Sequence, residues 1–211
     1  MIVIIDYESG NVGSIRNMLH RLRIRSEISR ARKVIAAASA IILPGIGAFD
    51  TCAGNLKKHD LVGPISEKVQ EQGAPVLGVC VGAQLMLEGS EEGVLPGFGW
   101  FRGHVRRFSF PPELNENLPV PHRGWNEIAV GPAGARLFDG LGNGASFYFV
   151  HSYYFSPEEP ECVAATAHYG FGFCAAMARS RIQAVQFHPE KSHKFGMKLY
   201  SNFAREAGLA A

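Results

Sequence analysis

One short segment of the chain has the residue types and spacing of a catalytic nucleophile. Within Gly78–Gly82, Cys80 is flanked by glycines two residues before it and two residues after it. A nucleophile elbow is a sharp, strained turn between a strand and a helix, and these glycines remove the Cβ atoms that would collide there. A helix beginning after Cys80 would also favour the reactive thiolate. The same five residues also fit a small buried cysteine in a tight turn, so the pattern alone leaves both interpretations open.

A histidine and a carboxylate near the end of the chain could supply the other catalytic groups. In an extended segment, residues two apart point to the same side, which would place His188 and Glu190 together. Pro189 disfavours a helix at His188 and keeps the pair extended. A carboxylate in this position orients an imidazole and stabilises its protonated form. Such a pair is usually an ordinary ion pair, but together with the elbow it predicts a triad of Cys80, His188 as general acid and base, and Glu190.

A thioester intermediate also needs backbone donors for the oxyanion. The segment Pro44–Gly47 follows a predicted strand, and its glycines allow backbone N–H groups to approach a ligand closely. Because open parallel sheets bind ligands at the carboxyl ends of their strands, this segment should lie beside Cys80. We therefore expect the N–H groups of Ile46, Gly47 and Val81 to form the oxyanion hole.

The elements that position these residues alternate between buried strands and helices. Continuous apolar runs predict strands buried on both faces at Ile2–Ile5, Ala40–Leu43 and Pro75–Val79. Helical patterns cover Val12–Leu22, Leu61–Gln72 and Ala83–Glu88, and Gly73 is a natural helix stop. The alternation predicts an α/β fold around a parallel sheet.

The composition changes after about residue 93, where Gly, Pro and aromatic residues dominate. Short strands are predicted at Val105–Phe108, Ile128–Val130, Ser146–Val150, Cys162–Ala167 and Ile182–Phe187, followed by a helix over Lys194–Glu206. Trp125 lies in a segment, His122–Asn126, with the composition of a polar turn. We expect one compact domain over residues 1–211 because the sequence shows no linker, repeat or low-complexity segment.

Composition excludes several classes of function. The 211 residues carry a net charge of +2, too small to imply a nucleic-acid partner. Seven of the 21 Lys and Arg residues lie between Arg16 and Lys33, where a solvated surface is the favoured interpretation and a site for an acidic partner or a phosphate is the alternative. The longest apolar run, Val34–Leu43, is too short to span a membrane. The four cysteines form no CxxC pair and the start of the chain has no export signal, so a cytoplasmic location is expected.

Two further site types fit the sequence poorly. Gly10–Gly13 lies between a predicted strand and a helix, as a phosphate loop would, but it lacks the full glycine pattern and no Gly-Lys-Ser/Thr follows. A plain strand-to-helix turn is the better interpretation. The eight histidines have no metal-ligand spacing, so neither a metal nor another cofactor is expected.

The chain resembles the class I, triad-type glutamine amidotransferases, and within them the glutaminase subunits of imidazole glycerol phosphate synthase. The elbow and the segment Gln186–Ser192 are common to the class, whereas two further segments are more specific to these subunits. The matching segments, which span essentially the whole chain, are Ile5–Tyr7, Ser9–Ser14, Leu43–Phe49, Gly78–Gly82, Pro121–Asn126, Tyr148–Tyr153 and Gln186–Ser192.

The resemblance implies a flavodoxin-like fold with a central, mostly parallel sheet flanked by helices and additional antiparallel strands. It implies that glutamine is hydrolysed to glutamate and ammonia, and that ammonia passes through a tunnel to a (β/α)8-barrel cyclase subunit in a heterodimer. The family's substrate-contacting positions correspond here to Gly45, Gly47, Gln84, Ser152 and Tyr153. Positions that face or gate the partner correspond to Asn11, Arg123, Trp125, Asn126, Tyr148 and Lys191. In this family the oxyanion strand is typically not fully set until the partner is loaded, so weak activity alone is expected.

Three departures from the family pattern leave alternatives open. Glu8 replaces a usual glycine, and Ala83 and Arg123 replace usual methionines; Arg123 would alter a partner contact. The tail Lys191–Gly196 also resembles paralogues that supply ammonia for sugar amidation in lipopolysaccharide O-antigen synthesis. A non-catalytic flavodoxin-like binding module and a cysteine hydrolase of another substrate are the remaining alternatives. The presence of all three triad candidates disfavours the module, and Gln84 with the oxyanion and His188 segments disfavours the other hydrolase.

Overall fold

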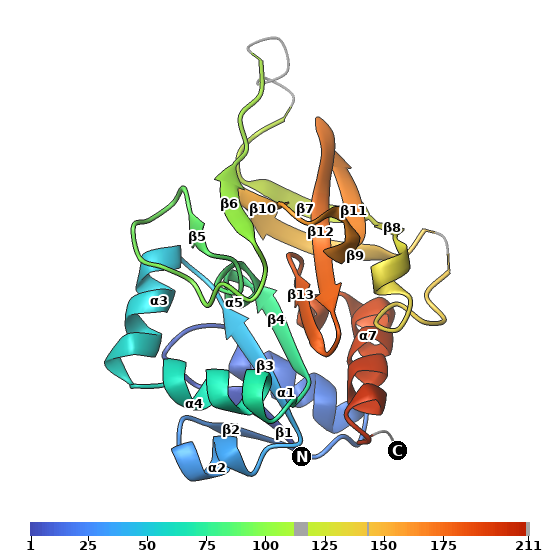
Figure 1. Ribbon diagram of the computed structural model, residues 1–211. Coiled ribbons are helices and arrows are strands. Elements are labelled where there is room, and N and C mark those ends of the chain that lie inside the picture. The colour runs from blue at the N-terminus through green and yellow to red at the C-terminus, as the bar shows by residue number, and fades with distance from the viewer. Residues whose placement is uncertain (112–117, 143, 210–211) are drawn as a thin grey trace.

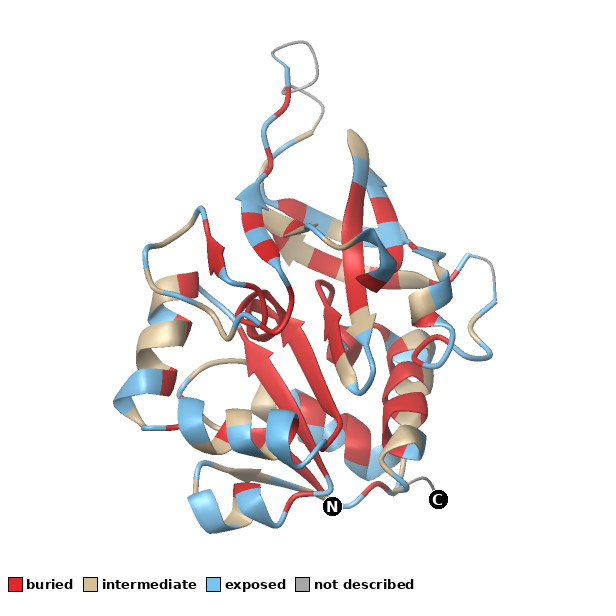
Figure 2. Ribbon diagram, in the orientation of Figure 1, coloured by how far each residue is buried: buried red, intermediate tan, exposed pale blue. Residues whose placement is uncertain are grey.

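The centre of the molecule is a block of five parallel strands. The computed structural model describes residues 1–111, 118–142 and 144–209. The parallel strands lie in the order β2 (Ser26–Ser29), β1 (Ile2–Ile5), β3 (Ala40–Gly45), β4 (Val76–Cys80) and β13 (Ile182–Val185) (Figure 1). Every residue of β1, β3 and β4 is buried (Figure 2), which explains their continuous apolar sequences.

Helices cover both faces of this block. They are α1 (Val12–Arg21), α2 (Arg32–Ala36), α3 (Phe49–Lys58), α4 (Val62–Ser66), α5 (Val81–Gln84) and α7 (His193–Glu206). The helix α1 packs with α7, whereas α2 packs with α4 on the other face (Figure 1). The order β2-β1-β3-β4 places the loops after β1, β3 and β4 at one edge of the sheet, where ligands bind in such folds.

An antiparallel extension continues the sheet beyond β13. It consists of β12 (Phe171–Arg179), β10 (Tyr153–Pro157) and β6 (Gly103–Arg107), with the short β5 (Gly89–Ser90) parallel to β6. The strand β11 (Val163–Tyr169) also pairs with β12, and β8 (Ala129–Val130) pairs with β11. A separate antiparallel pair is formed by β7 (His122–Glu127) and β9 (Ser146–His151). Single 3-10 turns lie at Pro132–Gly134, Pro160–Cys162 and Pro189–Lys191. The expected mixed fold, mostly parallel at its centre with additional antiparallel strands, is confirmed.

Two sequence predictions about local structure are wrong. The helix expected over Ala83–Glu88 is instead the single turn α5, because the carbonyls of Leu85, Met86 and Leu87 accept hydrogen bonds from the loop residues 98–101. The segment holding Trp125 is not a polar turn but part of β7, since Trp125 pairs with Tyr148 of β9. In both cases a partner distant in sequence determines the local backbone.

The helix predicted over Leu61–Gln72 is present over nearly that range, but it changes from α-helical to π-helical geometry along its length. It begins as α4 and continues as a π-helical segment over Glu67–Glu71. Gly73, predicted as its stop, has a φ of +66°. That left-handed conformation is the usual one after a helix and favours glycine.

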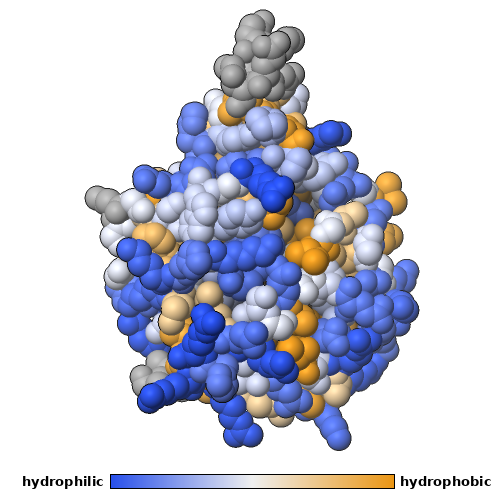
Figure 3. All heavy atoms as spheres, turned by 180° about the vertical axis from the view of Figure 1, so that it is seen from behind, coloured by the Kyte–Doolittle hydropathy of each residue, from blue (hydrophilic) through white to orange (hydrophobic). Residues whose placement is uncertain are grey.

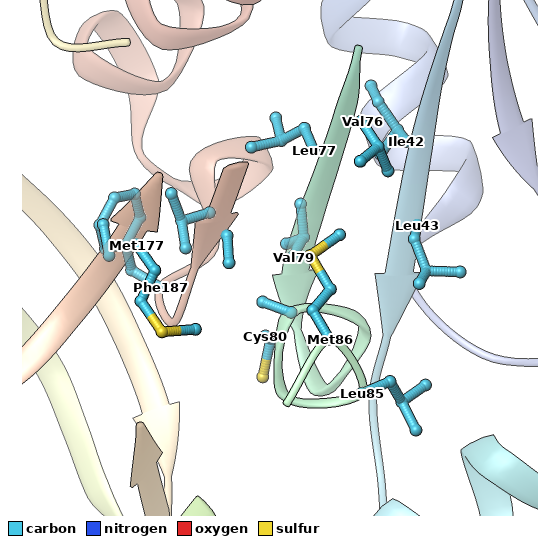
Figure 4. Packing of buried hydrophobic residues seen from close by; sticks show 14 of the residues in the cluster. Ile42, Leu43, Val76, Leu77, Val79, Cys80, Leu85, Met86, Met177 and Phe187 are labelled. Atoms are coloured by element: carbon cyan, nitrogen blue, oxygen red, sulfur yellow. The ribbon is translucent and has the colours of Figure 1, made fainter. Parts of the chain in front are cut away.

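The apolar core extends to the tip of β4. Figure 4 shows Leu43, Val79 and Met86 packed where β3 and β4 end, with Cys80 at the tip. Seen from behind, the surface is mostly hydrophilic, with hydrophobic atoms in separated small patches (Figure 3). None of the helices in the described part of the chain has the length and apolar character needed to cross a bilayer.

Candidate active site

Cys80 lies on a strained turn between β4 and α5. Its φ of +54° falls in the left-handed region that side-chain-bearing residues rarely adopt. The flanking glycines allow this turn to pack tightly. A Cβ atom at Gly82 would overlap the carbonyl oxygen of Leu43, and one at Gly78 would lie 2.6 Å from the Cα of Ala83. The sequence around Cys80 therefore has the geometry of a nucleophile elbow.

The elbow opens into a cavity of about 410 Å³ at the carboxyl ends of the parallel strands. Cys80 and His188 both line it, although they are more than 100 residues apart in sequence. The other predicted site residues on its walls are Asn11, Ile46, Gly47, Val81, Gln84, Ser152, Tyr153 and Lys191. The fold thus gathers the predicted nucleophile, base and ligand-contacting groups around one space.

His188 and Glu190 form a buried pair beside this cavity. Their Nδ1 and Oε1 atoms are 2.7 Å apart, and the side chains are 2% and 1% exposed. His188 is extended, with the 3-10 turn at Pro189 directly after it. Asn11 Nδ2 donates to the same Glu190 oxygen at 2.8 Å. The contact places Asn11, assigned by resemblance to the partner-facing positions, against the carboxylate predicted to be the acidic member of the triad.

The electrostatics of the pair favour the charged forms of both groups. Burial by itself lowers the pKa of His188, but hydrogen bonds and charges from Cys80 and Glu190 outweigh it and raise the pKa to about 10. Burial likewise raises the pKa of Glu190, yet the contacts with His188 and Asn11 bring it below its ordinary value.

The oxyanion segment follows β3 directly. Gly47 has a φ of +90°, which glycine adopts without strain. The N–H of Ile46 donates to Ser9 Oγ at 3.1 Å, and Ser9 Oγ donates to the carbonyl of Ile46 at 2.9 Å. Gly47 and Val81 lie on the cavity wall, but the Ile46 N–H is bound to Ser9 and does not face the cavity as a free donor.

Gly45 does not occupy the substrate-contacting place expected for it. It pairs with Cys80 across β3 and β4, and a Cβ there would overlap the Gly82 N atom and approach the Tyr7 hydroxyl to 2.9 Å. It is not among the residues that line the cavity. Its glycine is required by close packing beneath the elbow.

Four of the residues assigned to the partner side contact one another, and one of them, Lys191, lines the cavity. The Arg123 Nε donates to the Tyr148 hydroxyl at 3.4 Å, and the Lys191 ammonium lies 5.7 Å from the centre of the Tyr148 ring. Trp125, which is 50% exposed, contacts Tyr148 edge-to-face and stacks on His193. We call Arg123, Trp125, Tyr148 and Lys191 the rim cluster. Asn126 lies apart from it and donates to the carbonyl of His168.

The structure adds residues that sequence reasoning missed. Gln186 Nε2 lies 3.9 Å from the Cys80 Sγ, and its Oε1 accepts a hydrogen bond from Gln84 Nε2 at 3.2 Å. His151 lines the cavity as well. Gln186 lies two residues before His188 on one extended segment, so side-chain alternation could have found it, whereas Ser9 carries no such signal. The described residues contain no group of three or more His, Cys, Asp or Glu side chains placed to hold a metal ion.

Comparison with known proteins agrees with this geometry. Residues 3–207 match the sequence model of the family described as "Glutamine amidotransferase class-I". The chain belongs to this family. Over 204 residues it is 44% identical to the "Imidazole glycerol phosphate synthase subunit HisH" of Bdellovibrio bacteriovorus, covering 97% of this chain and 99% of that relative. It is 43% identical over 203 residues to "subunit HisH 2" of the same enzyme in Pseudomonas aeruginosa, covering 96% and 98%.

Solved structures share the fold at lower sequence identity. A structure described as "glutamine amidotransferase" superposes with a TM-score of 0.70 at 22% identity, covering 99% of this chain and 100% of the other. PurLQS from Thermotoga maritima gives a TM-score of 0.71 at 13% identity, covering 97% of each chain. The family membership and these likenesses together account for the parallel core and its antiparallel extension.

Proposed function

We propose that this chain is the glutaminase subunit of imidazole glycerol phosphate synthase, acting as a single amidotransferase domain over residues 1–211. The observation that carries the proposal is the cavity in which an elbow cysteine, a buried His–Glu pair and Gln84 meet. The near full-length relatives named HisH support the particular enzyme. The four unpaired thiols fit a reducing cytoplasm.

The geometry supports a stepwise hydrolysis of the glutamine side-chain amide. The Cys80 Sγ attacks the amide carbon, and backbone N–H groups of Gly47 and Val81 stabilise the oxyanion. The protonated His188 gives its proton to the departing nitrogen, so the C–N bond breaks and ammonia leaves a thioester behind. His188 then takes a proton from water, which attacks the thioester and releases glutamate and the thiolate. The Ile46 N–H joins the oxyanion hole only after its bond to Ser9 opens.

The ammonia produced needs an acceptor, and we infer that a second protein brings this acceptor to the cavity. The names of the relatives identify them as subunits, and we propose a (β/α)8-barrel synthase subunit as the partner, joined in a heterodimer. The rim cluster supplies the contact surface, with Trp125 half-exposed at its edge. Arg123 presents a cation there, which favours an acidic group on the partner.

Glutamate release with and without the purified synthase subunit and its ribulosyl ligand tests this function. We expect weak release from the chain alone and a large stimulation by the loaded partner. Release without stimulation would retain the glutaminase chemistry and favour the subunit that serves O-antigen sugar amidation. No release from the folded protein in either condition would contradict the proposal and favour a binding module.

Replacing Glu190 with glutamine should shift the pH dependence of glutamine hydrolysis. The change keeps the side-chain shape but removes the negative charge beside His188, so the pKa of His188 falls from about 10. The alkaline limb of the kcat/KM profile then moves to lower pH, and kcat falls by about 10- to 100-fold. An alkaline limb that stays in place would contradict the assigned role of Glu190.

The same pair links stability to pH. The raised pKa of His188 contributes stability that is complete below its ordinary value of 6.5 and is lost as the pH rises through about 10.

Glu158→Gln provides a matched control for the pH profile of the Glu190→Gln variant, because it makes the same change of residue type in a carboxylate that pairs with Arg102 on the exposed surface. That variant should leave the activity profile unchanged.

A further inference from the structure

A pair of buried histidines lies next to the cavity and takes no part in the hydrolysis described above. His122 begins β7 and His151 ends β9, and the two residues are opposite each other in the strand pair. The His122 Nδ1 and His151 Nε2 atoms are 3.0 Å apart. Only 4% of His122 and 6% of His151 are exposed, and His151 lines the cavity together with Cys80.

Aromatic rings surround the pair. His122 stacks on Tyr169 with ring centres 4.1 Å apart and also lies over Phe149. The edge of Phe108 faces His151 at 5.2 Å. Burial lowers the pKa of His122 to about 4 and that of His151 to about 3. Both imidazoles are therefore neutral at physiological pH.

Neutrality and the neighbouring groups assign a proton to one nitrogen of each ring. The carbonyl of Tyr153 lies 2.7 Å from His151 Nδ1 and can only accept, so His151 Nδ1 carries the proton. The Nε2 of His151 is then an acceptor, and His122 Nδ1 must donate to it. The Nε2 of His122 is left to accept from Asn126 Nδ2, 3.4 Å away. A chain of hydrogen bonds thus runs from the Asn126 amide through both imidazoles to the Tyr153 carbonyl, with each group donating to the next.

The Tyr153 carbonyl connects this chain of hydrogen bonds to the substrate side of the cavity. It also accepts a hydrogen bond from Gln84 Nε2 at 3.3 Å. Gln84 Nε2 contacts Gln186 Oε1 as well, and Gln186 Nε2 lies 3.9 Å from the Cys80 Sγ. The orientation of the carbonyl therefore determines where Gln84 and the wall formed by Ser152 and Tyr153 lie relative to the nucleophile.

We propose that His122 and His151 are positioning residues for glutamine: as two neutral rings that both carry the proton on Nδ1, they fix the Tyr153 carbonyl and, through it, Gln84 and the adjacent cavity wall. The kinetic part of this inference rests on the proposed glutaminase function. The assignment of the protons does not, because it depends only on the hydrogen bonds of the folded chain.

Nitrogen NMR of the full-length chain labelled with 15N-histidine tests the proton assignment. Each ring should show the pattern of an Nδ1–H tautomer, although neutral imidazole in water prefers Nε2–H. Neither ring should titrate between about pH 5 and pH 8, where an unperturbed histidine does. The His122→Asn and His151→Asn spectra, each of which lacks one of the two rings, assign the two signals. An Nε2–H pattern for either ring, or titration near the ordinary value, would overturn the inference even if the chain is an active glutaminase.

Kinetics of two His122 variants tests the positioning role. His122→Phe keeps a ring between Tyr169 and Phe149 but removes the donor to His151 Nε2. The KM for glutamine should rise about tenfold, while kcat changes by less than about twofold, because orientation is lost and the reacting groups remain. His122→Asn offers an amide N–H close to the former Nδ1 position and should restore most of the KM.

A purely structural role for His122 predicts the opposite order. Phenylalanine, which preserves the aromatic packing, would then retain the wild-type KM, and the smaller asparagine would be the more damaging change. That result would overturn the positioning role. If the unmodified chain releases no glutamate, the proposed function fails, and the NMR result still decides whether the proton assignment is correct.

Discussion

Replacing Cys80 with serine should reduce glutamate release by about 1,000-fold or more, both with and without the synthase partner. The serine hydroxyl is far less acidic than a thiol, so at the pH of the assay it is a much weaker nucleophile. Serine differs from cysteine only in having an oxygen atom in place of the sulfur atom, so the strained backbone at position 80 should accept it without rearrangement. Binding of the partner should therefore remain intact, and an assay of both properties separates chemistry from folding.

Cys162 offers a matched control for this substitution. It is a buried free thiol like Cys80, but it ends a 3-10 turn and does not line the cavity, and burial raises its pKa to about 11. Cys162→Ser should retain most of the glutaminase activity. Turnover by Cys80→Ser within about tenfold of the unmodified chain would remove Cys80 from the role of nucleophile.

Much of the parallel core can be predicted from the sequence because each of its buried strands is marked by the residue types within that strand alone. The strands β1, β3 and β4 are buried along their whole length, so each appears as an unbroken apolar run. The elbow is equally local, since its glycines are required by backbone contacts within a few ångströms of Cys80. The pairing of His188 with Glu190 is also predicted, but its backbone is not: only His188 is extended, and Glu190 lies in the 3-10 turn Pro189–Lys191.

The remaining features depend on contacts between segments far apart in sequence. The polar strand β2 lies at the edge of the sheet and has no apolar run to reveal it. The strand β7 exists because β9 supplies its hydrogen bonds. Asn11 reaches Glu190 across 179 positions, and Ser9 reaches Ile46 across 37. Residue type and local spacing do not indicate such contacts, so the hydrogen bond from the Ile46 N–H to Ser9 could not be predicted from the sequence.

Replacing Gly82 with alanine should strongly destabilise the fold near the site. Its Cβ would overlap the carbonyl carbon and oxygen of Leu43 in β3, and backbone atoms cannot turn away as a flexible side chain can. The free energy of unfolding, measured by urea denaturation, should fall by about 3 kcal/mol or more. Because β3 and the elbow must separate to relieve the overlap, the surviving folded protein should also lose glutaminase activity.

Gly54→Ala is the matched control for this prediction. Gly54 lies in the middle of α3, where an added Cβ meets only the Leu95 Cδ1 at 3.9 Å. Alanine there should leave the free energy of unfolding unchanged or raise it by up to about 1 kcal/mol, since alanine favours the helix. If Gly82→Ala unfolded at the same urea concentration as Gly54→Ala, the close approach of β3 and α5 could not be what holds Cys80 in its strained conformation. The nucleophile's geometry would then need another cause.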